Sequence, residues 1–316
     1  MAKVRLGDMA TVVTKGTTPT TIGFQFEDSG INFVKIESIS EDGTFLKEKF
    51  SHISDECNVQ TRRSQLQEND ILFSIAGAIG RSAIVTKEIL PANTNQALAI
   101  IRVPKGKIDY NYLLYALSSS AINQQATQHQ QGVAQLNISL KNVSDFLLPI
   151  YTEAMQKRIV HNLKKIDKLF FLRKQQLSKL DELVKARFVE MFGDPVKNTM
   201  DWEIKPLSEL GELNRGVSKA RPRNSPELLG GPYPLIQTGE VANAKTYITS
   251  FNSTYSEKGL AQSKMWPKGT LCITIAANIA QTSILTFDAC FPDSVVGFIS
   301  RNMTNELFIH YWFSFF

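Results

Sequence analysis

The side chains that could carry chemistry in this chain are polar and basic residues gathered in predicted loops. Arg, Lys, Asn, Gln, Ser and Thr side chains can read base edges, and cationic, hydroxyl and backbone N–H groups bind phosphates. Loops commonly carry binding residues. We select as candidate DNA-contact residues, in the first half, Lys15, Thr17, Thr18, Arg62, Arg63, Arg81, Asn93, Asn95, Gln96 and Gln131. In the second half we select Arg215, Lys219, Arg221, Arg223, Asn278 and Gln281. Each of these residues taken alone is more simply explained as a solvated loop residue. As a set at repeat-related positions, however, they favour recognition of DNA.

Catalytic motifs are missing from the sequence. It contains neither a GxGxxG nor a GxxxxGK[ST] phosphate loop, and no Asn-Pro-Pro or Asp-Pro-Pro motif followed by an aromatic residue. Asp194 followed by Glu203-Ile204-Lys205 loosely matches a nuclease pattern, but the pattern is short and falls in a predicted surface turn. We therefore predict no catalytic residue in this chain.

Metal and disulfide sites are not indicated either. The four histidines are scattered without HxH or HxxxH spacing, and the three cysteines form no CxxC pair. We predict no metal ligands and a reducing, cytoplasmic compartment. The most apolar stretch, from Ile71 to Gly80, is far shorter than the roughly 20 residues of a membrane-spanning helix, so no membrane association is expected.

The chain contains an internal repeat with an offset of about 200 residues. Its matching blocks begin at Leu6 and Leu207, at Lys15 and Arg215, and at Ile31 and Tyr233. Two further blocks pair Asn69–Gly77 with Lys268–Ala277, and Asn95-Gln96-Ala97 with Asp293-Ser294-Val295. Each module shows short alternating strands together with a helix, from Tyr110 to Gln125 in the first. The repeat therefore predicts a mixed α and β fold organised as module, spacer, module.

The spacer from Glu153 to Phe192 is predicted to be one helix about 60 Å long at 1.5 Å per residue. It carries the entire net charge of +5, with ten Lys and Arg against five Asp and Glu between residues 151 and 192. This basic excess is either a solvated helix face or an electrostatic footprint for DNA. An imperfect heptad pattern predicts a helix-pairing stripe of Ile159, Leu163, Ile166, Phe170, Leu177, Leu180, Val184 and Met191. Its partner is a second helix of this chain, a second copy or another subunit.

The chain resembles the specificity subunits of type I restriction–modification systems over its whole length. The matching motifs are Val4–Ala10, Glu68–Arg81, Gly132–Ser139, Leu148-Pro149-Ile150 with the following Glu153, Gln156 and Arg158-Ile159, and Ala186–Asp194. The resemblance implies an α+β fold with two target-recognition domains, at residues 1–150 and 193–316, and a coiled-coil spacer helix at 151–192. It further implies a non-catalytic subunit that reads a bipartite target in double-stranded DNA and docks methyltransferase subunits. Restriction subunits then join, and S-adenosylmethionine, ATP and Mg²⁺ are expected on those partners, with no cofactor on this chain.

The sequence departs from the family pattern in its second module. That module stops at Phe313-Ser314-Phe315-Phe316, which matches the start of the helix after Tyr110 in the first module. We expect either a C-terminally truncated form or a homodimer that pairs its spacer helices. Two other functions are weighed against DNA recognition: a coiled-coil protein-interaction adaptor, and a stand-alone DNA-modifying enzyme.

Overall fold

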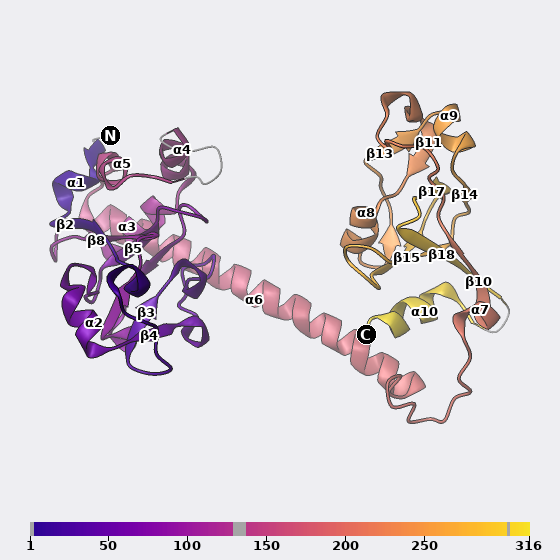
Figure 1. Cartoon of the computed structure of the whole chain (residues 1–316), viewed down its shortest axis with the longest axis horizontal. Coiled ribbons are helices and arrows are strands. Elements are labelled where there is room, and N and C mark those ends of the chain that lie inside the picture. Colours follow the sequence, from indigo (N-terminus) through magenta and orange to yellow (C-terminus); the bar gives the residue numbers. More distant parts are fainter. Residues whose placement is uncertain (1–2, 129–136, 302–303) are drawn as a thin grey trace. The chain divides into compact units, whose positions relative to one another are not determined.

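The computed structural model describes residues 3–128, 137–301 and 304–316. The chain divides into two compact units, Met1–Phe171 and Leu172–Phe316, and the division falls inside the long helix α6 (Glu153–Phe192) (Figure 1). Each unit mixes helices with small sheets, so the predicted mixed fold is confirmed. Within the described residues, no helix is both long and apolar enough to cross a membrane.

Unit one is built on two sheets and a short strand pair. The larger sheet has the order β2-β8-β5-β6, all antiparallel, with strands β2 (Val12–Lys15), β8 (Leu98–Arg102), β5 (Ile71–Ser74) and β6 (Ser82–Ile84). The smaller sheet has the order β4-β3-β7, with strands β4 (Ser51–Ile53), β3 (Ile31–Val34) and β7 (Ala92–Thr94). In that sheet β3 runs antiparallel to β4 and parallel to β7. The strand pair joins β1 (Lys3–Arg5) to β9 (Leu147–Pro149).

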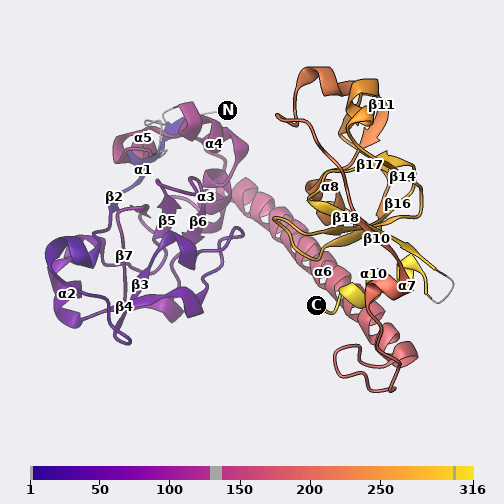
Figure 2. The same ribbon diagram turned by 45° about the vertical axis from the view of Figure 1, so that its right-hand side comes forward.

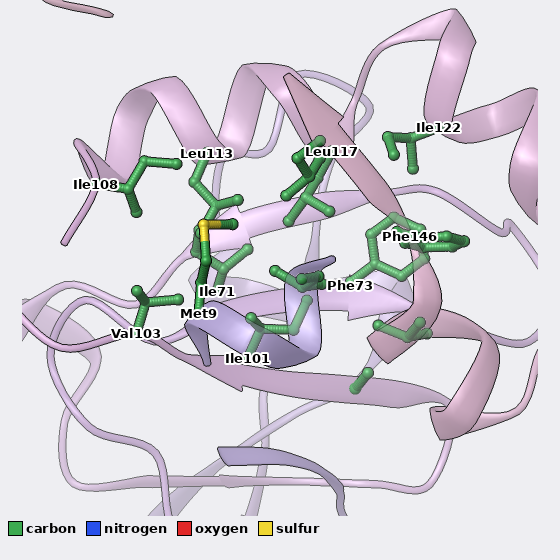
Figure 3. Close-up of a cluster of buried hydrophobic side chains, with 14 of the residues drawn as sticks. Met9, Ile71, Phe73, Ile101, Val103, Ile108, Leu113, Leu117, Ile122 and Phe146 are labelled. Carbon is green, nitrogen blue, oxygen red and sulfur yellow. The ribbon is translucent and has the colours of Figure 1, made fainter. Parts of the chain in front are cut away.

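Strands β5 and β8 are apolar except for their last residues, Ser74 and Arg102, because both of their faces are buried. Ile71, Phe73 and Ile101 face a core that is completed by helices, as Figure 3 shows. The alternate residues Leu72 and Ile100 face a second core shared with the smaller sheet. The helices of this unit are α1 (Leu6–Met9), α2 (Asp55–Gln60), α3 (Tyr110–Leu117), α4 (Ser120–Gln128) and α5 (Leu140–Asp145).

The predicted helix from Tyr110 to Gln125 is in fact two helices, α3 and α4. The chain breaks at Ser118 and Ser119, because the Ser119 side chain bonds locally to the backbone. Its hydroxyl donates to the carbonyl of Ala116 at 2.6 Å and accepts the N–H of Ile122 at 3.4 Å. Serine hydroxyls compete in this way with the hydrogen bonds of a continuous helix.

Unit two, whose sheets are drawn in orange to yellow in Figure 2, repeats the strand order of unit one and has one additional edge strand in each sheet. Its larger sheet has the order β10-β18-β15-β16-β12, with strands β10 (Gly211–Arg215), β18 (Val295–Ser300), β15 (Leu271–Thr274), β16 (Thr282–Leu285) and β12 (Tyr247–Ile248). Its smaller sheet has the order β13-β11-β17-β14, with strands β13 (Ser253–Tyr255), β11 (Leu229–Leu235), β17 (Ala289–Cys290) and β14 (Met265–Trp266). The helices are α7 (Leu207–Leu210), α8 (Thr238–Asn243), α9 (Glu257–Ala261) and α10 (Glu306–Phe313). The predicted repeat is thereby confirmed.

The structural register of the repeat differs by one residue from the sequence match near the last strand. The N–H of Ile75 bonds to the carbonyl of Ala97, and that of Ile275 bonds to the carbonyl of Ser294. The counterpart of Asp293 is therefore Gln96, and the prediction that paired it with Asn95 is wrong by one position.

The turn after β5 and β15 has the same left-handed backbone in both units. It uses Gly77 (φ 69°) and Gly80 (φ 91°) in unit one, but Ala277 (φ 60°) and Ala280 (φ 63°) in unit two. A residue with a Cβ pays about 1–2 kcal/mol in that conformation, so the second turn is strained where the first is not.

Helix α6 has the predicted bounds, and its two ends pack into different units. Val160 is buried in the core of unit one, and Phe188 packs on Phe192 and Phe308 in unit two. Between these ends the apolar stripe is open to solvent, with Phe170 73% exposed. Of the predicted pairing residues, Ile159 and Leu163 are half-buried, and the exposed ones are Ile166, Phe170, Leu177, Leu180, Val184 and Met191.

The three cysteines are free thiols, and each is fully buried in a core. Cys57 lies in unit one, whereas Cys272 and Cys290 lie in unit two. Burial raises the pKa of all three thiols above its ordinary value.

Candidate nucleic-acid interface

In unit one, the end of β2 and the segment before β8 form a corner that gathers several candidate residues. We call it corner one, residues 15–18 and 94–97. The N–H of Gly16 bonds to the carbonyl of Asn95 at 3.1 Å, and the N–H of Thr17 bonds to that of Thr94 at 3.2 Å. A Cβ on Gly16 would lie 1.8 Å from the Thr94 carbonyl oxygen, so only glycine allows this approach. The corner is therefore held by backbone contacts.

Corner one leaves polar groups available at the surface. The Lys15 side chain is exposed, and Thr17, Thr18 and Asn95 are half-buried. The Thr18 hydroxyl donates to Oε1 of the exposed Gln96. Corner one thus carries an ammonium, hydroxyls and amides, and these are the groups that bind phosphates and base edges.

Unit two has the same corner at residues 215–218 and 291–294, which we call corner two. The N–H of Val217 bonds to the carbonyl of Phe291 at 3.1 Å, as that of Thr17 does to Thr94, and a Cβ on Gly216 would lie 2.3 Å from the Phe291 carbonyl oxygen. The Arg215 guanidinium donates from Nε to the Asp293 carbonyl at 3.2 Å. The repeat thus carries the same backbone device and replaces Lys15 by an exposed arginine.

Further cations of unit two converge on corner two. Arg223 forms an ion pair with the Asp293 carboxylate, and Arg221 lies 3.6 Å from its other oxygen. Arg221 also donates to the carbonyl of Ser218 at 2.7 Å. Lys219 is exposed in the same loop. The sequence predictions included these cations but missed Asp293, because the sequence match aligned it with Asn95 and gave no sign that it contacts the arginines.

The turn after each central strand carries the remaining loop candidates. Asn278 and Gln281 are exposed in unit two, and the Thr274 hydroxyl holds the turn by donating to the Asn278 carbonyl. In unit one Arg81 is half-buried and donates from Nη1 to the carbonyl of Ile39 at 2.9 Å. Arg81 therefore binds the protein's own backbone and fixes a neighbouring loop.

Arg62 and Arg63 lie together on one short 3₁₀ turn, Arg62–Ser64, with both side chains exposed. The loop after this turn is fixed by a buried ion pair between Asp70 and Arg102. Nε of Arg102 lies 2.6 Å from Oδ1 and Nη2 lies 2.7 Å from Oδ2, and Nη2 also reaches the carbonyl of Gln65 at 3.4 Å. The hydrogen bond to Asp70 raises the pKa of Arg102. The pair thus positions the segment that follows the two arginines.

Asn93 is the candidate that the structure contradicts. Its side chain is fully buried in β7, where Nδ2 donates to the Asn58 side chain at 3.0 Å and to the Thr61 hydroxyl at 2.9 Å. Its Oδ1 accepts the N–H of Thr94. The amide is fully used inside the fold, so the prediction of a direct DNA contact is wrong. Gln131 and the start of the Gly132–Ser139 motif lie outside the described residues.

Other sites of unit two do not join these corners. An open groove of about 650 Å³ lies among α7, α10, the end of α6 and the Asp194–Lys205 linker, and its lining is mainly apolar. The nuclease-like residues Asp194, Glu203 and Lys205 are among its lining residues. In the part of the chain that the structure describes, no group of three or more His, Cys, Asp or Glu side chains could hold a metal ion.

Comparison with known proteins identifies the family. The family model for the type I restriction modification DNA specificity domain matches residues 1–182 and 199–316. The type I restriction enzyme EcoBI specificity subunit of Escherichia coli is 33% identical over 143 residues, which cover 45% of this chain and only 29% of that relative. The putative type I restriction enzyme MjaX specificity subunit of Methanocaldococcus jannaschii is 24% identical over 305 residues, covering 90% of this chain and 70% of that relative.

A solved structure shares the fold. It comes from work on complex assembly and conformational transition of the type I R-M system, and the match covers 99% of this chain and 79% of that one. The TM-score is 0.60 at 16% identity, so this likeness concerns the fold alone. The family assignment rests on the family model, which matches both units. The chain belongs to the family of type I restriction modification DNA specificity domains.

Proposed function

We propose that this chain is the specificity subunit of a type I restriction–modification complex and reads a bipartite target in double-stranded DNA. The observation that carries the proposal is the duplicated corner. Each unit builds the same glycine-dependent backbone contact and uses it to present an exposed cation, Lys15 in one unit and Arg215 in the other. Two equivalent corners in one chain suit the two halves of a split target.

The chemistry of the corners supports contacts both to phosphates and to bases. Lys15 and Arg215 supply the charges that neutralise phosphates and fix the register on the duplex. The amide of Gln96 offers the donor and acceptor pair that reads adenine in the major groove. Asn278 and Gln281 offer the same groups from the neighbouring turn of unit two. In this proposal the chain itself performs no reaction and binds no cofactor.

Helix α6 is the proposed docking element for methyltransferase subunits. Its exposed stripe includes Phe170 and Leu177, and contiguous exposed apolar surface of this kind marks sites of protein–protein interaction. These subunits would hold S-adenosylmethionine, and restriction subunits would bring ATP and Mg²⁺, all in the cytoplasm. A homodimer through α6 is the alternative use of the same stripe.

DNA binding by the purified full chain tests the proposal. Binding to duplex DNA is measured by fluorescence anisotropy at several salt concentrations, because each neutralised phosphate contributes a slope of about −0.9 to log K against log [salt]. Lys15→Ala and Arg215→Ala should each reduce that slope by about one phosphate. Lys105→Ala and Lys268→Ala are matched controls, since these exposed lysines lie near the opposite ends of strands β8 and β15. If the control variants reduced the salt slope as much as Lys15→Ala and Arg215→Ala do, the proposal would be contradicted.

Assembly is tested by co-purification with a type I methyltransferase subunit expressed together with this chain, followed by methylation mapping. A complex that methylates a split target supports the proposal. Phe170→Glu places a charge on the open stripe and should abolish the complex without unfolding either unit, because this side chain is 73% exposed. Asp181→Lys is the control variant: it inverts the charge of an exposed residue on the same helix, outside the apolar stripe, and should leave the complex intact. A complex that survives Phe170→Glu would remove α6 from the docking role.

The second candidate function is a coiled-coil adaptor that binds only proteins. It is favoured by the same open stripe on α6 and requires no DNA contact at the corners. An adaptor would show no steep salt dependence of DNA binding, and Lys15→Ala would leave its partner affinity unchanged.

A further inference from the structure

Corner two contains a carboxylate where corner one has none. Asp293 pairs with Arg223 and with Arg221, and its backbone carbonyl accepts the Arg215 guanidinium. The side chains of Arg221 and Arg223 remain 56% and 42% exposed, and the Asp293 side chain is 40% exposed. One acidic residue therefore binds three cations at the surface that we propose for DNA contact.

The equivalent residue of unit one is neutral. Gln96 occupies the position of Asp293, because Ala97 and Ser294 make the same backbone bond to the central strand. Gln96 pairs with the Thr18 hydroxyl and leaves Lys15 without an acidic partner in the described part of the chain. The two corners therefore differ in one respect: the cation of corner one has no acidic partner among the residues that the structure describes, whereas Arg221 and Arg223 of corner two are paired with Asp293.

We propose that Asp293 is a specificity-determining residue that holds Arg221 and Arg223 away from DNA until the correct half-site is bound. The inference rests on the proposed function. A guanidinium that binds a carboxylate must leave it before it can bind a phosphate or a base edge, so Asp293 weakens contact with every sequence. A correct half-site restores the loss through base contacts, whereas a random sequence offers only phosphates. Asp293 therefore penalises non-specific binding by unit two.

The size of the effect follows from the exposure of the pairs. Solvated ion pairs of this kind change an equilibrium by about two- to fivefold each, and salt screens them. Two pairs released together should raise affinity for random-sequence duplex DNA by about four- to twenty-fivefold at low salt. If the two released arginines each neutralise a phosphate, the slope of log K against log [salt] should also become steeper by up to about 1.8.

The experiment compares the full chain with Asp293→Asn on a random-sequence duplex. Asp293→Gln, which restores the residue type of corner one, should give the same gain. Glu209→Gln is the matched control, because Glu209 is exposed in unit two, loses the same charge and makes no ion pair within the described residues. Asp293→Asn in an Arg221→Ala, Arg223→Ala background should give no gain.

Each outcome separates the inference from the function on which it rests. A gain in both Asp293 variants that disappears without the two arginines supports the inference. Binding by the wild-type chain that is unchanged in both variants, or a gain matched by Glu209→Gln, overturns the inference and leaves the proposed function intact. If no form binds DNA, the proposed function fails and the inference fails with it. Tryptophan fluorescence shows whether each variant has kept unit two folded.

Discussion

The ion pair between Asp70 and Arg102 gives the sharpest test of how unit one is held together. Asp70 is fully buried and the Arg102 side chain is 27% exposed, with two charged hydrogen bonds of 2.6 and 2.7 Å between them. In unit two the equivalent positions are Thr270 and Ile299, so the repeat has a version of this site without charges. Three variants introduce the residues of unit two into unit one: Asp70→Thr, Arg102→Ile, and the double variant with both substitutions.

The expected magnitudes follow from which charge is left unpaired. Arg102→Ile strands a fully buried carboxylate whose remaining partner is the N–H of Gln67, and should cost about 3–5 kcal/mol. Asp70→Thr should cost somewhat less, about 2–4 kcal/mol, because the guanidinium is partly solvated. The double variant leaves no charge unpaired, and replacement of a buried pair by uncharged residues is often nearly neutral. It should therefore be more stable than the Arg102→Ile variant.

Hydrogen exchange followed by mass spectrometry on the full chain is the suitable assay, because it reports each unit separately. Peptides over β5 and β8 report unit one, and peptides over β15 and β18 serve as an internal control. A loss of 3 kcal/mol corresponds to about a hundredfold faster exchange through opening of the unit. If the two single losses simply add in the double variant, the charges are not coupled and the reasoning is refuted. Faster exchange in unit two would also refute it.

Three further predictions concern unit two and can be followed by tryptophan fluorescence during urea unfolding, since all three tryptophans belong to that unit. Replacing Ala277 and Ala280 by glycine should stabilise it by about 0.5–1 kcal/mol per site, because positive φ is strained for alanine; a loss of stability would contradict this. Gly216→Ala should destabilise it by about 1–3 kcal/mol, because the new Cβ lies against the Phe291 carbonyl; a neutral result would refute the close contact. Burial lowers the pKa of His310, so stability should be full above about pH 6.5 and fall as pH drops towards the folded-state pKa. His310→Gln should remove that dependence, and a pH profile that it leaves unchanged would exclude the histidine as its source.

The features that the sequence predicts well are those that local patterns define. The bounds of α6 follow from heptad spacing between Pro149 and Gly193, and the repeat follows from apolar blocks that form the central strands. Lys15 and Arg215 are exposed at equivalent corners because each precedes a glycine that packs against backbone.

The errors arise where a distant contact decides the outcome. Asn93 is polar in sequence but buried, because Asn58 and Thr61 satisfy its amide from another segment. Arg81 looks like a free loop cation but binds carbonyls about 40 residues away along the chain. The charge held by Asp293 is invisible in the sequence for the same reason, since Arg221 and Arg223 lie some 70 residues before it.

Because all three thiols are buried, the folded chain should not react with thiol reagents. A maleimide reacts with the thiolate, which needs both access and deprotonation, and each cysteine lacks access and has a raised pKa. The rate at which Cys57 is labelled therefore measures how often unit one opens, and the labelling rates of Cys272 and Cys290 measure the opening of unit two. A single cysteine introduced as Lys219→Cys, at an exposed position, would then be the sole fast-reacting thiol, and a dye placed there would report on corner two without replacement of any native cysteine.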